Sequence, residues 1–360
     1  MSIVVVAAAV AFSAFVLSSP NDPIPLPEPP SGQAEDSSVE ILAENLNKPR
    51  SIAVSEDRVF VTERGGAIRV VQGGELLEEP LVSLRPADVF DGGLLGIALD
   101  PDFSSNHFIY VFLTYEEEGV LWNKIMRITE SENRLTDIQT IFDRIPGSAF
   151  SNGGFLKFGP DGKLYVGTGS VSDSSHKPQS LDSLSGKVLR INPDGTIPED
   201  NPFEDSPVYS HGHRNPQGMA WDNSGNMYLA ELGPDKNDEI NLVVPGGNYG
   251  WPERECAGDE RFEDAVLCYD PAIEPGGILY YSGGKIDLES PFVMASLRAT
   301  NVYQLDFEEG LPSQKSILSG TGRVRDVVEG PDGSLYVITS NTDGKGFPDS
   351  SDDKLLRILK

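Results

Sequence analysis

One segment recurs along this chain and constrains the fold more than any other feature. The clearest copy is FGPDGKLYVGTG at 158–169, and EGPDGSLYVIT at 329–339 is nearly identical. Six copies, separated by roughly 40 to 65 residues, have the period of propeller blades. The four other copies are WDNSGNMYLA at 221–230, AVSEDRVFVTE at 53–63, ALDPDFSSNHFIYVFLT at 98–114 and, weakest, LESPFVMASL at 288–297.

Each copy has the pattern of two strands joined by a tight turn. Pro presets φ, Asp or Asn bonds the local backbone, and Gly takes the left-handed position. β-Branched and aromatic residues follow the turn, and no long 3.6-residue apolar period occurs after residue 20. The sequence therefore predicts an all-β fold, a six-bladed β-propeller with four-stranded antiparallel blades. The turn aspartates are predicted to close hairpins and not to bind calcium.

The chain divides into three parts. Residues 1–19 contain an apolar run from Ile3 to Leu17, the length of a signal-peptide core and short for a spanning helix. No Lys or Arg precedes Lys48, so an uncleaved N-terminal anchor is the alternative. Residues 20–38 are rich in Pro, Ser and acidic residues and read as a disordered linker. Residues 39–360 form the predicted propeller, which we expect to be secreted or extracytoplasmic.

The net charge of -28 excludes some partners. Nucleic acid needs clustered Lys and Arg, so we expect no nucleic-acid binding and no membrane contact beyond the N-terminal anchor. The many carboxylates leave ligands for a hard cation such as calcium. The chain's two cysteines, Cys256 and Cys268, predict one local disulfide in an exported protein, and two free buried thiols are the alternative.

The densest polar constellation is SHGHRNPQG at 210–218, followed by ELGPDKNDEIN at 231–241 and GGNYGWP at 246–252. Arg214 and Asn215 stand just before a predicted strand. Arg298, Arg323 and Arg325 occupy predicted inner-strand positions of late blades, and the last two share one face. Guanidinium groups gathered at an axis indicate a carboxylate ligand, and pairing with internal acids such as Asp326 is the alternative.

These motifs, in this order, resemble the soluble sugar dehydrogenases that depend on pyrroloquinoline quinone (PQQ), the glucose/sorbosone dehydrogenase family. GLLGIALDPDF at 93–103 and LSGKVLRINPDGTIPEDNPF at 184–203 resemble it too. The resemblance covers residues 38 to 360 and implies a six-bladed propeller with PQQ at its axis and one calcium against the cofactor. It implies cofactor-binding roles for Asp91, Arg214, Asn215, Arg298, Arg323 and Arg325.

The resemblance also implies metal ligands. The backbone carbonyls of Gly233 and Pro234 would bind the calcium beside the cofactor. A second, structural calcium would be held by Glu239, the carbonyl of Tyr249, and the loop of Glu255, Ala257 and Asp259, and the alternative for these acids is a solvated surface. The predicted disulfide would brace that loop.

The chain departs from the family at the reacting side of the site. Ser151 stands where the family has its His general base, and Phe150 stands where an acid often orients that base. Asp91 replaces a cofactor-facing Gln or Glu, Phe155 replaces an Arg, and Ser170 replaces an Asp. Losing a positioned base typically costs 10²- to 10⁴-fold in rate. His213 is the favoured substitute over His176 and His211, and a structural role for it is the alternative.

Three functions follow. The first is an exported PQQ- and Ca²⁺-dependent oxidoreductase that acts on an aldose sugar or related alcohol and passes electrons to an external acceptor. The second is a ligand-binding propeller of the same family without turnover. The third, least favoured, is a calcium-dependent lactonase-type hydrolase, which needs acidic and amide side chains around an axial metal.

Overall fold

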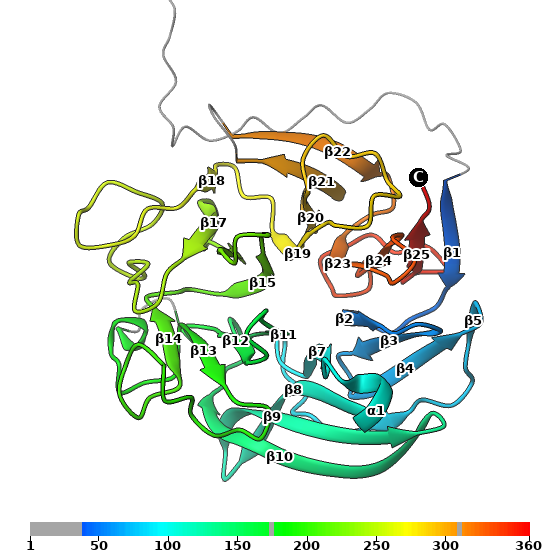
Figure 1. The fold of residues 1–360 in the computed structure, drawn as a ribbon, viewed down its shortest axis with the longest axis horizontal. Coiled ribbons are helices and arrows are strands. Elements are labelled where there is room, and N and C mark those ends of the chain that lie inside the picture. Colours follow the sequence, from blue (N-terminus) through cyan, green and yellow to red (C-terminus); the bar gives the residue numbers. More distant parts are fainter. Residues whose placement is uncertain (1–37, 173–175, 308–311) are drawn as a thin grey trace, which may run out of the picture.

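The computed structural model describes residues 38–172, 176–307 and 312–360, and these form six sheets arranged around one axis (Figure 1). The predicted all-β, six-bladed propeller is confirmed. Helix is confined to α1 (Phe103–Asn106) and a 3₁₀ turn at Lys177–Gln179 in the described residues. The signal-peptide and linker segments predicted for residues 1–19 and 20–38 lie outside the described residues, apart from Ser38.

In each of the first three blades, the strands follow one another in chain order from the axis outward. Blade 2 has the longest strands, and blade 1 carries a fifth short strand, β6, paired with β4. The strands are β2 (Pro49–Val54), β3 (Arg58–Glu63), β4 (Ala67–Gln72), β5 (Glu75–Leu76) and β6 (Val82–Ser83); β7 (Leu94–Leu99), β8 (Phe108–Glu117), β9 (Val120–Ser131) and β10 (Arg134–Pro146); β11 (Gly153–Phe158), β12 (Leu164–Thr168), β13 (Lys187–Ile191) and β14 (Val208–His211).

The last three blades complete the ring. In the sixth blade the outermost strand is β1, from the start of the described chain, which pairs antiparallel with β25. The strands are β15 (Pro216–Trp221), β16 (Met227–Glu231), β17 (Asp238–Val243) and β18 (Leu267–Tyr269); β19 (Pro275–Tyr280), β20 (Phe292–Ser296), β21 (Asn301–Asp306) and β22 (Ser313–Ser319); β23 (Val324–Glu329), β24 (Leu335–Thr339), β25 (Leu355–Ile358) and β1 (Val39–Ala43).

The repeat occupies the same place in every blade, the hairpin between its first and second strands. The turn aspartates bind local backbone, as predicted. Asp161 Oδ1 accepts from the amide of Lys163, and Asp222 Oδ1 accepts from the amides of Ser224 and Asn226. The second strands are apolar because they are buried on both faces, whereas the outermost strand β10 is largely exposed.

The core consists of six apolar clusters, one between each pair of neighbouring blades. For example, Leu156 and Leu164 of blade 3 pack with Tyr110 and Ile125 of blade 2. The last cluster joins Ile338 of blade 6 to Val59 of blade 1. Since the blades meet face to face all round, the first strands surround the axis, and the loops that precede them converge at one end of it. In the part of the chain that the structure describes, no helix has the length and apolarity that a bilayer crossing demands.

Candidate active site

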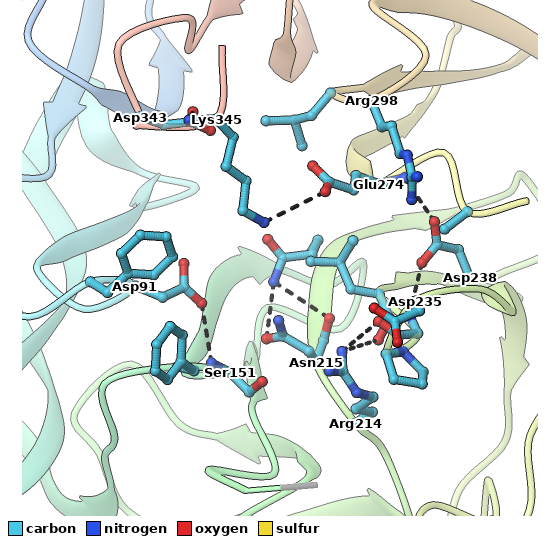
Figure 2. A pocket seen from close by; sticks show the side chains of 18 of the residues that line it. Asp91, Ser151, Arg214, Asn215, Asp235, Asp238, Glu274, Arg298, Asp343 and Lys345 are labelled. Atoms are coloured by element: carbon cyan, nitrogen blue, oxygen red, sulfur yellow. Dashed lines mark hydrogen bonds and ion pairs between the residues drawn. The ribbon is translucent and has the colours of Figure 1, made fainter.

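A cavity of about 560 Å³ lies on the propeller axis, at the end where the first strands begin (Figure 2). Most of its lining comes from loops just before a first strand or just after a second strand. Every residue predicted to bind the cofactor lines it, together with Ser151. The charged and amide residues of its wall are Arg64, Asp91, Arg214, Asn215, Gln217, Asp235, Asp238, Glu274, Arg298, Arg323, Arg325, Asp343 and Lys345.

Five arginines in one cavity of a protein with a net charge of -28 need counter-anions. Two of them, Arg64 and Arg298, make no side-chain hydrogen bond or ion pair with any described residue. A third, Arg325, has a side chain only 13% exposed, and its buried Nε lacks a hydrogen-bond partner in the described structure. Burial, together with nearby Arg50, lowers the pKa of Arg325 to about 9. A buried cation whose hydrogen-bonding groups are only partly satisfied is costly, so this cavity favours an anionic ligand.

The internal acids satisfy only part of this positive charge. Arg323 contacts Asp343 at 3.0 Å and Glu274 at 2.8 Å, and Arg325 approaches Asp343 at 3.5 Å. Although burial acts to raise it, the pKa of Glu274 is held below its ordinary value by Arg323. The predicted alternative partner, Asp326, faces the neighbouring blade, where it accepts from the amide of Ile52.

The predicted strand positions of the arginines hold only in part. Arg325 lies in the first strand β23, but Arg323 precedes that strand and Arg298 lies in the turn between β20 and β21. The repeat is weakest in this blade, so the sequence gives the least information there about where the strands end. Arg298 still reaches the cavity, because the turn after a second strand lies at the same end of the axis as the loop before a first strand.

Arg214 and Asn215 stand on the connection between β14 and β15, as predicted. Arg214 donates to the carbonyls of Leu232 and Gly233 at 3.0 and 2.6 Å, and its guanidinium lies over Trp251. Asn215 Oδ1 accepts from the amide of Gly153 and from Gln217. Gly233 and Pro234 also line the cavity, so their loop borders the expected cofactor site.

Ser151 lies in the cavity wall beside Asp91, and Arg214 stands before the first strand of the next blade (Figure 2). Its amide donates to Asp91 Oδ2 at 3.2 Å, and its φ of 54° is in the left-handed region. Few residues other than glycine adopt this region without strain, and His is among those enriched there. Phe90 and Phe150 pack against each other at 5.1 Å between ring centroids, and both remain about half exposed.

His213 does not line the axial cavity and is fully buried. Its Nε2 pairs with Ser210 Oγ at 2.8 Å, its Nδ1 with Glu231 Oε2 at 2.9 Å, and its ring stacks on Tyr249. His211, on the other side of the left-handed Gly212, packs its ring against Phe203. This geometry favours the structural role that the sequence left open for His213.

A second cavity of about 10 Å³, the size of one water, lies beside the first. Gly233, Glu239, Tyr249 and Glu255 line it together with Glu231. Burial, and next the charge of Glu231, raises the pKa of Glu239 to about 8. A cation in this small cavity would relieve the repulsion between the two buried carboxylates.

Other residues predicted as ligands lie elsewhere. Asp259 and Ala257 do not line the small cavity, and the Asp259 carboxylate binds Arg261 at 2.7 Å. Among the described residues, no group of three or more His, Cys, Asp or Glu side chains is arranged to hold a metal ion. The predicted disulfide between Cys256 and Cys268 is present and ties this loop to strand β18.

Four charged wall residues lie outside every motif that the sequence analysis singled out: Arg64, Glu274, Asp343 and Lys345. A signal was available for the first three, because Glu274 directly precedes a first strand as Asn215 does, while Arg64 and Asp343 follow second strands. Their positions before a first strand or after a second strand of a blade would have identified them as wall residues. Lys345 comes from an irregular loop whose path no sequence pattern predicts.

These features define a β-propeller with an arginine-rich axial pocket next to a small acidic cavity. Residues 46–357 match the glucose/sorbosone dehydrogenase family. The chain belongs to this family of sugar dehydrogenases, as its motifs predicted.

Individual relatives agree with this assignment. The aldose sugar dehydrogenase YliI of Escherichia coli (strain K12) is 32% identical over 85% of this chain and 91% of its own length. Quinoprotein glucose dehydrogenase B of Acinetobacter calcoaceticus is 27% identical, with 87% of each chain covered. The PQQ-bound aldose sugar dehydrogenase of Streptomyces coelicolor has a similar structure, with a TM-score of 0.79 and 36% identity over 89% of this chain and 97% of that one.

Proposed function

We propose that this protein is an exported, PQQ- and Ca²⁺-dependent oxidoreductase. It oxidises an aldose sugar or related alcohol and passes the electrons to an external acceptor. The observation that carries the proposal is the set of five guanidinium groups on the axis, of which Arg64, Arg298 and Arg325 have few or no partners among the described residues. PQQ is a planar tricarboxylate, and arginine binds carboxylates with paired hydrogen bonds.

The residues of the cavity wall would have different roles in such a site. Arg325, Arg323 and Arg214 would bind the carboxylates of PQQ, which when bound supplies the two-electron oxidant. Asn215 and Asp91 complete the polar wall, and Arg298 stands exposed at the cavity edge. Phe90 and Phe150 would exclude water from the site, because a bound substrate would cover their half-exposed rings.

The proposal includes two calcium-binding sites. The carbonyls of Gly233 and Pro234 would bind one ion against the cofactor. Glu239, with the carbonyl of Tyr249 and the nearby Glu255, would bind the other. The support is the buried, mutually repelling pair Glu231 and Glu239, because a cation there would replace the proton that Glu239 otherwise retains. The disulfide supports export, because such bonds persist in oxidising compartments.

A ligand-binding propeller without turnover is the second candidate, favoured by Ser151 at the position of the family's base. We do not propose a lactonase-type hydrolase, because the chain belongs to an oxidoreductase family.

One experiment separates the first two candidates. Purified apoprotein is loaded with PQQ and Ca²⁺ and then assayed for aldose-dependent reduction of a redox dye across a sugar panel. The oxidoreductase proposal expects a bound-quinone spectrum together with turnover. Binding with no turnover on any aldose or alcohol would instead support the binding propeller. A protein that does not take up PQQ would contradict both.

A further inference from the structure

The axial cavity contains five carboxylates among its described residues, and most are already engaged by cations or amides. Asp238 is fully buried and accepts from the amides of Gly233, Ile273 and Glu274. Asp343 contacts two arginines, and Glu274 contacts Arg323 and Lys345. Each oxygen of these three carboxylates already has a hydrogen-bond or ion-pair partner, so none is free to approach the hydroxyl group of a ligand. Asp91 and Asp235 remain.

Asp91 is the better placed of the two. Asp235 is exposed to solvent in the turn after Pro234, on the side of the cavity where Arg214 lies. Asp91 is partly buried on the side of Ser151, and its carboxylate has a single hydrogen bond, from the Ser151 amide to Oδ2. Its Oδ1 has no partner among the described residues. One oxygen is thus anchored, and the other is available to a ligand.

The backbone holds Asp91 rigidly. Its amide donates to the carbonyl of Ala149 at 2.8 Å, and its carbonyl accepts from Asn152 Nδ2 at 3.3 Å. Gly93, with φ of 132°, allows this loop to approach Arg64, whose carbonyl lies 2.4 Å from where a Cβ would stand. The carboxylate is therefore positioned before any ligand arrives, which general-base catalysis requires.

The surroundings of Asp91 are mixed. The rings of Phe90 and Phe150 give the cavity an apolar wall at this point, which a bound substrate would seal from water. Arg50 and Arg325 interact electrostatically with the carboxylate from the axial side. The carboxylate of Asp91 therefore has cationic neighbours as well as an apolar wall beside it.

We propose that Asp91 is the catalytic base of this protein and accepts the hydroxyl proton of the sugar or alcohol substrate. The inference rests on the proposed function. In the balanced step, the O–H bond of the substrate hydroxyl breaks and its proton moves to Asp91. The hydrogen on the carbon that bears this hydroxyl leaves with its electron pair. A C=O double bond forms, and the two-electron oxidant is the quinone of the proposed function.

Asp91→Asn tests the proposal and Asp88→Asn is the matched control. Asparagine retains an oxygen for the Ser151 amide, so the fold should persist, which thermal unfolding checks. Asp88 is an exposed carboxylate of the same loop that does not line the cavity. We expect Asp91→Asn to lower kcat by 10²- to 10⁴-fold with PQQ affinity within about threefold of wild type. The acidic limb of the kcat/KM pH profile should disappear, and Asp88→Asn should change none of these.

The experiment distinguishes failure of this inference from failure of the proposed function. Wild type that binds no PQQ overturns the proposed function and this inference with it. Wild type that turns over, with Asp91→Asn equally active, overturns the inference alone. So does a parallel loss of PQQ affinity and rate, which would make Asp91 a cofactor ligand only. Loss of turnover in Asp235→Asn with activity retained in Asp91→Asn would transfer the role to Asp235.

Discussion

At the residue scale, the site is defined by charges that lack sufficient partners. Among the described residues, Arg325 is buried with an unbonded Nε and Asp91 has one carboxylate oxygen without a partner, and both line the axial cavity. Groups of this kind cost stability in the free protein and are retained where a ligand completes them. Ser151 is a second kind of costly feature in the same wall, because its left-handed backbone is strained.

A change at Ser151 tests the assignment of the base. Ser151→His in the wild-type background is expected to change kcat less than tenfold, because Asp91 already accepts the proton. In the Asp91→Asn background the same change should recover at least tenfold of the lost rate, with a pH profile that follows an imidazole near 6.5. Steady-state kinetics from pH 5 to 8 measures both.

A Ser151→His single variant with a hundredfold higher rate would contradict this account, because wild type would then lack a working base. The left-handed φ of residue 151 is one that histidine tolerates, so the variant should fold.

Individual residues also show where sequence reasoning ends. The family resemblance assigned Asp91, Arg214 and Asn215 to the cofactor and Ser151 to the reacting side, and the structure brings all four to one cavity. Asp259 was placed at the calcium site by resemblance, but the side chain reaches Arg261. The path of a long irregular loop depends on packing that no repeat or turn pattern encodes.

At the element scale, the connection between β17 and β18 is the part most dependent on a ligand. Its Cys256 amide donates to Glu239 Oε1 at 2.6 Å, and the disulfide joins it to β18. Backbone hydrogen bonds to Tyr209, His211 and Gly212 hold the first part of this connection against the neighbouring blade. A cation at Glu239 would therefore stabilise the loop and the blade together.

Chelation should expose this dependence. Removing Ca²⁺ is expected to lower the Tm of wild type by a few degrees, since a ligand at a hundredfold excess over its Kd contributes about 2.7 kcal/mol. Glu239→Gln should abolish the response, whereas Asp259→Asn should retain it because Asp259 binds Arg261 outside the cavity. Differential scanning calorimetry with and without chelator measures the effect. A Tm that chelation leaves unchanged in wild type would exclude a structural calcium site.

At the scale of the whole molecule, the ring closes through the pairing of β1 with β25 and through Asp326. The Asp326 carboxylate of β23 accepts from Ser51 Oγ at 2.9 Å and from the Ile52 amide at 3.0 Å, so it joins the sixth blade to the first. The six repeats predicted the number of blades. They could not predict the closing strand, because Val39–Ala43 lies outside every repeat and pairs with residues more than 300 positions away.

The Asp326 junction should make stability depend on pH. Burial raises the pKa of Asp326 to about 6, so the folded protein keeps this proton to a higher pH than the unfolded chain. Its stabilising contribution is fully present below about pH 4 and is lost as the pH rises through 6. The difference in unfolding free energy between wild type and Asp326→Asn should therefore shrink by about 3 kcal/mol between pH 4 and 7. Denaturant unfolding at both pH values measures it, and a difference that is constant or grows with pH would contradict the assignment.

The central claim is that the axial arginines form a binding site for PQQ. Its most direct test is an equilibrium titration of PQQ into apoprotein at constant Ca²⁺, followed by quinone absorbance. The matched variants are Arg325→Gln, which removes the buried guanidinium, and Arg261→Gln, which removes an exposed one far from the cavity lining. We predict saturable binding at one PQQ per chain, unchanged in Arg261→Gln and weakened at least tenfold in Arg325→Gln. Absence of saturable binding by wild type, or equal affinity in Arg325→Gln, would contradict the account.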